Sequence, residues 1–248
     1  MTSTSSKIRR WEPLPPPVPA DRLPRHVGVI MDGNGRWAEQ QGLPRIRGHQ
    51  AGVEAVRDIV SYCGQIGLQA LTLYAFSTEN WKRPRAEIEF LMVLLERYLR
   101  SEVEELHANG VRFLPIGRLT DLPDGVQRLL RDAEARMACN HGLNLCVALS
   151  YGAQDELVEA ARRLCEKVER GTLVPDEIDG AAVAAHLFAA DLPPVDLLIR
   201  TAGERRLSNF LLWQASRAVF RVEARCWPAF RRAQLGAALE AYAGTRAR

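Results

Sequence analysis

The chain has 248 residues, 47% of them hydrophobic, which is enough to bury one substantial core. Its 33 basic and 30 acidic residues give a formal net charge of +3, and this balance argues against a nucleic-acid-binding protein. No apolar run approaches the roughly 20 residues that span a bilayer, and the five scattered cysteines lack metal-ligand spacing. We therefore expect a soluble, cytoplasmic protein with reduced thiols.

Residues 1–22 differ in composition from the rest of the chain, being rich in Ser and Thr and then in Pro. This composition favours a flexible or polyproline-type arm over packed structure. Trp11 is expected to dock either on the body of the chain or on a neighbouring molecule. Residues 23–248 contain no internal repeat or low-complexity linker, which predicts one domain.

The stretch HVGVIMDGNGRW, residues 26–37, joins a short apolar run of strand type to a glycine-rich turn. In an open α/β sheet, ligands bind where a strand turns into a helix, because backbone amides point outward there. The two glycines would let the backbone approach an anion, Arg36 would grip phosphate oxygens, and Asp32 would hold a magnesium ion against them. For these residues alone, a plain surface turn is the alternative interpretation.

Strands and helices alternate along the rest of the chain. Strands are predicted at about 70–76, 111–116, 143–149 and 195–199, and helices from about 48, at 126–139, 154–170, 180–188 and 234–242. Residues 210–213 and 219–222 are further short apolar segments. The alternation predicts a single α/β domain with a mostly parallel central sheet of about six strands, flanked by helices.

The helix predicted over residues 86–107 is apolar around more of its circumference than one sheet face requires. A surplus apolar face needs a second apolar neighbour. A dimer interface or a deeper core would explain it, and so would the wall of a hydrophobic tunnel. Candidate tunnel-facing residues are Ala75, Phe90, Leu94 and Leu145.

Three predicted strands end in polar loops, at residues 32–36, 77–85 and 200–208. In a parallel sheet these ends lie along one edge, so the loops can converge on a single site. The basic residues in and near them are Arg36, Arg45, His49, Arg83, Arg200, Arg205 and Arg206. One phosphate would not need so much positive charge, which predicts a site for two diphosphates.

The segments MDGNGRWA, GHQAG, YAFSTENWKRP and IRTAGERRLSNFLLWQ resemble, in this order, motifs of the cis-prenyltransferase family, whose best-known member is undecaprenyl diphosphate synthase. The resemblance extends from about residue 26 to about residue 240. It implies that residues 23–248 form a catalytic domain with a hydrophobic tunnel, with Mg²⁺ as cofactor and prenyl diphosphates as substrates. It also implies a homodimer, with peripheral membrane contact only if the product is long.

By this resemblance, Asp32 is the magnesium-holding acid and forms the catalytic set with Asn80 and Arg83. The residues that match the site of the allylic diphosphate are Gly33, Asn34, Gly35, Arg36, Arg45 and His49, with Trp37 as a further substrate-binding candidate. The residues that match the loop orienting and covering the substrates are Ser77, Asn80, Trp81 and Arg83. The residues that match the pocket of the second, non-ionising diphosphate are Arg200, Arg206 and Ser208. Structural roles stay open for Asn80 and Ser208 as caps and for Trp81 as a core residue.

The sequence departs from the family on the side of the second substrate. Val219 stands where the usual relative has a metal-binding glutamate, and Glu223 would lie about 13 Å further along a strand, too far to replace it. Ala202, Arg205 and residues 150–154 depart as well. We expect that an allylic diphosphate, such as dimethylallyl or geranyl diphosphate, still ionises while the acceptor differs, giving a short, branched, lavandulyl-type product. Head-to-tail elongation with isopentenyl diphosphate and a non-catalytic partner subunit are the alternatives.

Overall fold

The computed structural model describes residues 8–245, and within them six strands form one sheet in the order β3-β4-β2-β1-β5-β6. The strands are β1 (His26–Ile30), β2 (Ala70–Ser77), β3 (Arg112–Ile116), β4 (Asn144–Tyr151), β5 (Leu197–Arg200) and β6 (Val219–Val222). Each pair of neighbouring strands is parallel. The predicted α/β fold with a parallel sheet is therefore confirmed, and the apolar segment at 219–222 is its sixth strand.

Helices form at or near the residues where the sequence predicted them. They are α1 (Asn34–Gln40), α2 (Arg45–Gln65), α3 (Arg85–Ala108), α4 (Asp124–Met137), α5 (Ala153–Glu169), α6 (Gly180–Ala184) and α7 (Arg232–Thr245). The helix predicted over residues 180–188 is shorter than expected. It ends at Ala184, and the Phe188 amide donates a hydrogen bond to the buried Glu156 carboxylate (2.8 Å).

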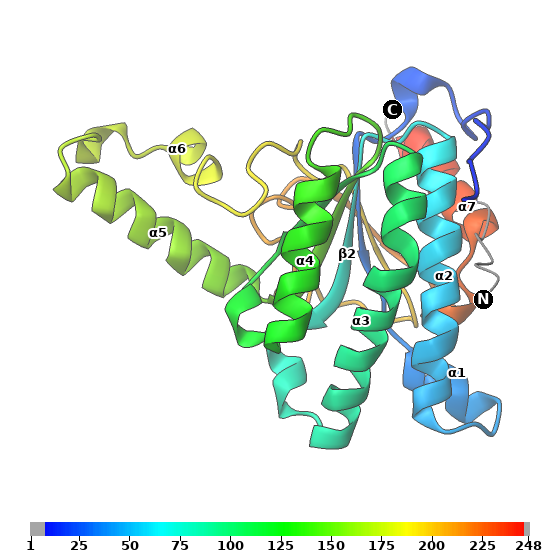
Figure 1. Cartoon of the computed structure of the whole chain (residues 1–248). Helices are drawn as coiled ribbons and strands as arrows, with labels where there is room; N and C mark the ends of the chain where they lie inside the picture. The colour runs from blue at the N-terminus through cyan, green and yellow to red at the C-terminus, as the bar shows by residue number, and fades with distance from the viewer. Residues whose placement is uncertain (1–7, 246–248) are drawn as a thin grey trace.

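The two faces of the sheet are covered differently. Helices α2, α3, α4 and α7 pack on one face and enclose the larger core (Figure 1). The other face is covered largely by two irregular segments on either side of β5, 188–195 and 207–218, and Phe210 of the second is fully buried and stacks on Tyr74 at 4.4 Å. Because both faces are covered, all five residues of β1 are buried, as an all-parallel sheet requires.

Helix α5 projects away from the body of the molecule, with α6 beside it (Figure 1). Contacts at its first turns anchor it, because the Glu156 carboxylate is 1% exposed and accepts hydrogen bonds from Tyr151, Gln214 and the Phe188 amide. No helix among residues 8–245 is both long and apolar enough to cross a bilayer.

The described part of the N-terminal arm lies against the body, whereas the sequence predicted a flexible segment. Trp11 donates from its backbone to the Asn109 side chain (2.7 Å) and from its indole to Glu105 (2.9 Å). Its ring covers Gly64, where a Cβ atom would come within 2.6 Å of it. Trp11 therefore docks on its own chain, on α2 and α3. Residues 1–7 of the predicted arm lie outside the described residues.

Candidate active site

The three polar loops converge because β1 lies between β2 and β5 in the sheet. The loops after these strands meet at one edge and line a single cavity of about 500 Å³. We call this the polar cavity. Its polar and charged lining residues are Asp32, Asn34, His49, Ser77, Glu79, Asn80, Arg83, Arg200, Arg206, Ser208 and Asn209. The structure thus gathers nine of the predicted site residues in one place.

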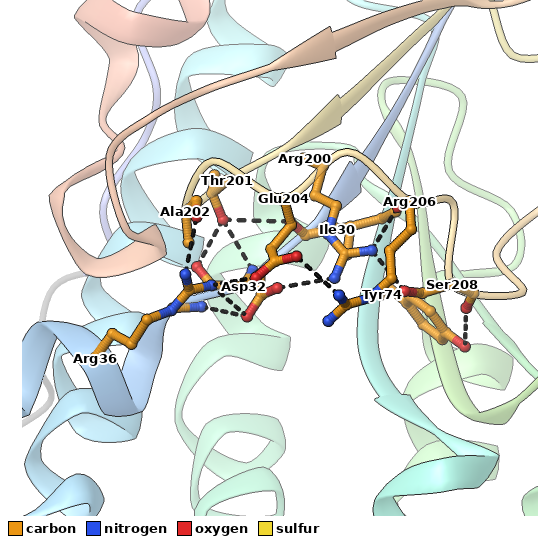
Figure 2. A network of polar contacts seen from close by, with 11 residues as sticks. Ile30, Asp32, Arg36, Tyr74, Arg200, Thr201, Ala202, Glu204, Arg206 and Ser208 are labelled. Carbon is orange, nitrogen blue, oxygen red and sulfur yellow. Dashed lines mark hydrogen bonds and ion pairs between the residues drawn. The ribbon is translucent and has the colours of Figure 1, made fainter.

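Asp32 is held firmly where β1 ends. Its carboxylate accepts hydrogen bonds from the Gly33 amide (2.7 Å) and from the Arg200 guanidinium (2.9 Å), and Arg36 lies 3.5 Å away (Figure 2). The Thr201 hydroxyl bonds the Asp32 backbone, with 2.8 Å to the amide and 2.7 Å to the carbonyl. The side chain stays 30% exposed, so the carboxylate is fixed in position and still faces the cavity.

The glycine-rich turn after Asp32 is closely packed. Gly33 has a φ of +96°, a left-handed conformation that favours glycine, and a Cβ there would lie 2.7 Å from the Ala202 Cβ. Asn34 begins α1, and its side-chain oxygen is buried without a hydrogen-bond partner among the described residues. Since a buried polar atom without a partner is costly, this oxygen is a candidate for contact with substrate.

The basic residues of the first and third loops share one acid, Glu204. Glu204 lies 3.5 Å from Arg36 and 2.8 Å from Arg206, and Arg36 also donates to the Ala202 carbonyl (3.0 Å; Figure 2). Sequence analysis missed Glu204, although an acid beside Arg205-Arg206 in a basic loop was the available signal. Arg205 is exposed and lies outside the polar cavity.

Arg200 carries a buried charge, with its side chain only 4% exposed. Its guanidinium donates to the Arg206 carbonyl and the Ser208 hydroxyl as well as to Asp32, while its Nε has no partner among residues 8–245. A buried cation that lost its carboxylate would be strongly destabilised. Asp32 and Arg200 therefore act as one unit of the site.

The second loop is shaped by a cap. The Asn80 side chain accepts a hydrogen bond from the Ser77 amide (3.0 Å), so the alternative role of Asn80 as a cap is confirmed. Arg83 donates to Glu87 (2.8 Å), a residue that sequence analysis missed, and His49 lies 3.4 Å from the same carboxylate. Burial lowers the pKa of His49 below its ordinary value and Arg83 adds to this lowering, whereas Glu87 opposes it.

Six of the predicted site residues do not line the polar cavity, namely Gly33, Gly35, Arg36, Trp37, Arg45 and Trp81, although Gly33 and Arg36 contact the Asp32 carboxylate beside it. Trp81 donates to the Ser150 hydroxyl (2.9 Å) and packs edge-on against Phe76, as its alternative role in the core predicted. Arg45 pairs with Glu39 (2.8 Å), and its guanidinium covers Gly35 so closely that a Cβ there would lie 2.6 Å from it. Trp37 lies on α1 outside the residues that line the cavity.

A second, apolar cavity of about 150 Å³ lies between α2, α3 and strands β2 and β4. It shares six lining residues with the polar cavity, namely Met31, Asn34, His49, Tyr74, Ala75 and Leu91. The β2–β4 pairing is irregular around Ala75, which leaves this small residue exposed at the junction. Ala75, Leu94 and Leu145 line the apolar cavity as predicted, whereas Phe90 does not. The surplus apolar face of α3 therefore forms a cavity wall.

Position 219, where the usual relative has a metal-binding glutamate, does not lie at the edge of the sheet that carries Asp32. Val219 pairs with Leu197 at the amino end of β6 and packs on the core, while Val222 pairs with Arg200 at the other end. A side chain at position 219 therefore lies away from the edge that carries Asp32. Glu223 follows β6 at the site edge, with its amide bonded to the Arg200 carbonyl (2.8 Å).

A metal ion at this site would need ligands from a bound substrate as well as from the protein. Within residues 8–245 no three His, Cys, Asp or Glu side chains group together so as to hold a metal ion by themselves. Magnesium is commonly bound by one or two carboxylates together with substrate phosphates. The exposed part of the Asp32 carboxylate fits such an ion.

Comparisons with known proteins agree with this fold and site. A family model described as "Putative undecaprenyl diphosphate synthase" matches residues 30–248. An isoprenyl transferase from Brucella abortus is 50% identical over 219 residues, 88% of this chain and 86% of that protein. A ditrans,polycis-undecaprenyl-diphosphate synthase specific for (2E,6E)-farnesyl diphosphate, from Aliivibrio fischeri, is 46% identical over 88% of this chain and 85% of its own.

Among solved structures, lavandulyl diphosphate synthase from Lavandula x intermedia in complex with dimethylallyl diphosphate superposes with a TM-score of 0.87. It is 39% identical, and the match covers 90% of this chain and 96% of that one. The fold and site thus define an enzyme that transfers prenyl groups. The chain belongs to the cis-prenyltransferase family, typified by undecaprenyl diphosphate synthase.

Proposed function

We propose that the protein couples an allylic prenyl diphosphate, such as dimethylallyl or geranyl diphosphate, to a second C5 prenyl diphosphate and releases pyrophosphate. The main support for this proposal is that the polar cavity and the apolar cavity adjoin. A polar cavity with three arginines opens through six shared residues into an apolar cavity. A diphosphate that bears a hydrocarbon tail is the type of molecule that would occupy both.

The proposed reaction begins when the allylic C–O bond breaks and its electron pair leaves with the diphosphate. The double bond of the second substrate then forms a new C–C bond to the allylic carbon, and a proton is lost to the released pyrophosphate. Preorganised positive charge beside the leaving group stabilises this transition state. Asp32, Asn80 and Arg83 are assigned to the reacting end.

The two diphosphates are assigned to opposite sides of Asp32. Asn34, Arg36 and His49 would contact the allylic diphosphate, and Arg200, Arg206 and Ser208 the second one. Bound Mg²⁺ would neutralise charge on the leaving diphosphate, and Asp32 would hold it there. Removal of divalent metal with a chelator is expected to abolish turnover.

The acceptor has two candidates. Isopentenyl diphosphate is supported by the similarity to the undecaprenyl diphosphate synthase of A. fischeri, and dimethylallyl diphosphate by the similarity to lavandulyl diphosphate synthase. The purified protein would be incubated with Mg²⁺ and dimethylallyl plus geranyl diphosphates, with and without isopentenyl diphosphate. A branched product without isopentenyl diphosphate would identify irregular coupling, and a linear product that requires it would identify head-to-tail elongation. Absence of coupling under both conditions would contradict the proposed function.

The alternative of a non-catalytic subunit is disfavoured because the polar cavity retains Asp32, Asn80 and Arg83 together. If the chain were an accessory subunit, Asp32→Ala would leave the activity of its complexes unchanged. We expect instead that this variant alone is inactive.

We also propose a homodimer. Helix α5 projects from the body, and β6 is an edge strand with partly exposed residues (Figure 1). Apolar side chains are exposed in this region, among them Val158 on α5 (51%) and Trp213 (39%). Such a surface suits an interface between copies of the chain.

A further inference from the structure

Ser150 is a fully buried residue of β4 in a strained backbone conformation. Its φ is +45°, a left-handed value that few residues other than glycine, asparagine and aspartate adopt. Phe76 of β2 pairs with Leu149. The following residue, Ser77, already pairs with Tyr151, so Ser150 is the extra residue of a β-bulge. A bulge turns a side chain out of the regular strand pattern, and bulges are frequent beside active sites.

The Ser150 side chain links two loops through two hydrogen bonds. Its hydroxyl accepts a hydrogen bond from the Trp81 indole (2.9 Å) and donates one to the Asp121 carboxylate (2.8 Å). An indole N–H only donates and a carboxylate only accepts, so the direction of both bonds is fixed. We call these three side chains the Trp81 relay. It joins the second loop of the site, residues 77–85, to the turn η3 (Leu119–Asp121).

The end of the Trp81 relay at η3 is anchored in the body of the molecule. The Arg118 guanidinium lies 3.2 Å from the Asp121 carboxylate, and the Arg118 amide donates to the Ser150 carbonyl (3.1 Å). Gly117 has a φ of +113°, and a Cβ there would lie 2.0 Å from the Leu149 carbonyl oxygen, so this turn lies directly against β4. Ser150 is therefore held through its backbone as well as through its hydroxyl.

The other end of the Trp81 relay belongs to the loop that carries Asn80 and Arg83. Trp81 lies between these two residues in the turn η2 (Thr78–Lys82), and its ring packs edge-on against Phe76. Asn80 and Arg83 line the polar cavity, whereas Trp81 does not. The Arg83 amide donates to the Asn80 carbonyl (3.1 Å), which closes the backbone around Trp81. Anchoring Trp81 therefore fixes the position of both cavity residues.

We propose that Ser150 is a positioning residue for the coupling reaction, holding Asn80 and Arg83 at the polar cavity through Trp81. Ser150 does not line the polar cavity itself, so it acts through the relay. This inference rests on the proposed function, because that proposal assigns Asn80 and Arg83 to the reacting end. Small displacements of groups at a reacting centre lower turnover steeply, whereas the diphosphate contacts of the first and third loops do not depend on the relay. Loss of the relay should therefore lower kcat more than it changes KM.

Hydrogen–deuterium exchange of residues 77–85 tests the relay without requiring turnover. Ser150→Ala removes the hydroxyl, and Ser150→Gly removes it while adopting the positive φ without strain. In both variants this loop should exchange at least about fivefold faster than in the wild type, because a hydrogen bond that holds it is lost. Trp81→Phe keeps a ring beside Phe76 and lacks the indole N–H, so it should give a similar increase.

Ser61→Ala is the matched control for removal of a buried hydroxyl. Ser61 is 5% exposed, and its hydroxyl donates to the Asp58 carbonyl within α2 (3.1 Å). This substitution leaves the Trp81 relay intact. Exchange of residues 77–85 and the rate of coupling should therefore match the wild type.

Initial rates with dimethylallyl and isopentenyl diphosphates then measure the effect on the reaction. Ser150→Gly should lower kcat by about tenfold or more and change KM by less than about threefold. The double variant Ser150→Gly/Trp81→Phe should be no slower than the slower single variant, because both changes break the same bond. Full additivity of the two losses would overturn the inference, and so would a wild-type kcat in Ser150→Gly.

The two measurements separate this inference from the proposed function. Faster exchange in the Ser150 variants, with no coupling by the wild type, would support the role of Ser150 in holding the loop and contradict the coupling reaction. Coupling by the wild type, with unchanged exchange in the Ser150 variants, would support the reaction and contradict the role of Ser150.

Discussion

The ion pair between Asp32 and Arg200 (2.9 Å) joins the first and third loops of the site and is shorter than the Arg36–Glu204 pair (3.5 Å) between the same loops. Asp32→Asn keeps the shape of the side chain and removes its charge. We expect the rate of pyrophosphate release to fall by about 100-fold or more, since the group that would hold Mg²⁺ against the leaving diphosphate is lost. The measurement is an initial rate with dimethylallyl and isopentenyl diphosphates at saturating Mg²⁺.

Glu89→Gln serves as the matched control for this change. Glu89 is an exposed acid of α3 that pairs with Arg85 at 2.8 Å, and such surface pairs contribute little. It should retain the wild-type rate. If Asp32→Asn were as active as this control, the assignment of Asp32 would be wrong.

The buried histidine of the site gives stability a dependence on pH. Burial lowers the pKa of His49 below its ordinary value of 6.5. As the pH falls below 6.5, the unfolded chain takes up a proton that the folded chain does not, so the free energy of unfolding should decrease, by at most about 1.4 kcal/mol per pH unit for this residue. His26, whose pKa is also lowered by burial, should act in the same direction.

Urea unfolding of the wild type and of His49→Gln at pH 7.5 and pH 5.5 would measure this effect. The variant should lose less stability on acidification, while the contribution of His26 remains. Equal losses in the two proteins would show that His49 takes up its proton equally in the folded and unfolded states.

Sequence reasoning at the residue scale succeeded where topology alone decides position. Asp32 follows β1, and Arg200 is the last residue of the adjacent parallel strand β5, so the positions of the strand ends were enough to predict that the two side chains meet. The direction of the Trp81 side chain and the partner Glu87 were not predictable, because each depends on how a loop or helix turns relative to its neighbours. The contacts of such residues are set by tertiary packing, which a local sequence pattern does not contain.

At the scale of elements, the close approach of α1 and α2 depends on glycine. A Cβ at Gly48 would lie 1.9 Å from the Asn34 carbonyl oxygen. Gly48→Ala should therefore push the helices apart and lower the free energy of unfolding by about 1–3 kcal/mol. Because Asn34 lines both cavities, the variant should also bind prenyl thiolodiphosphates more weakly.

Gly244→Ala is the control for the effect of alanine itself. Gly244 lies in α7 with no atom within 4 Å of the position that its Cβ would take. Alanine there should be neutral or should stabilise by about 0.5 kcal/mol. Chemical denaturation measures both variants, and equal stability of Gly48→Ala and wild type would show that the two helices can separate at no cost.

Periodicity predicted the long elements more reliably than the short ones. Helix α3 was expected over residues 86–107 and spans Arg85–Ala108, because its apolar spacing is sustained over six turns. The shorter α6 ends early, since the Phe188 amide is drawn to Glu156 of α5. That contact joins distant parts of the chain and has no local signature.

At the scale of the whole molecule, the proposed dimer is open to a direct test. Sedimentation equilibrium should give twice the 27.7 kDa mass of one chain. Val158→Glu places a charge on the projecting helix α5 and should weaken association by about tenfold or more, because an unpaired buried carboxylate is costly. Val93→Glu, at a similarly exposed valine of α3, should associate like the wild type. A monomeric wild type would contradict the proposal.

Predictions for the whole molecule were limited to what composition and the order of the elements can show. The composition of residues 1–22 predicted a flexible or polyproline-type arm, and Trp11 was expected to dock on the body of the chain or on a neighbour. It docks on Gly64 and bonds Glu105, and a composition argument does not identify these distant partners. The single domain and parallel sheet followed from the alternation of strands and helices. The size of the apolar cavity did not follow, because it depends on how α2 and α3 pack against strands β2 and β4.

The strand order has a consequence for synthesis of the protein. β1 leaves the ribosome early, but one of its edges pairs with β5, which is translated near the end of the chain. Until then a nascent chain carries an open, mostly apolar strand edge, a known starting point for aggregation. Translation that stops before Arg200 would leave this edge uncovered, and such fragments should depend on chaperones or be degraded.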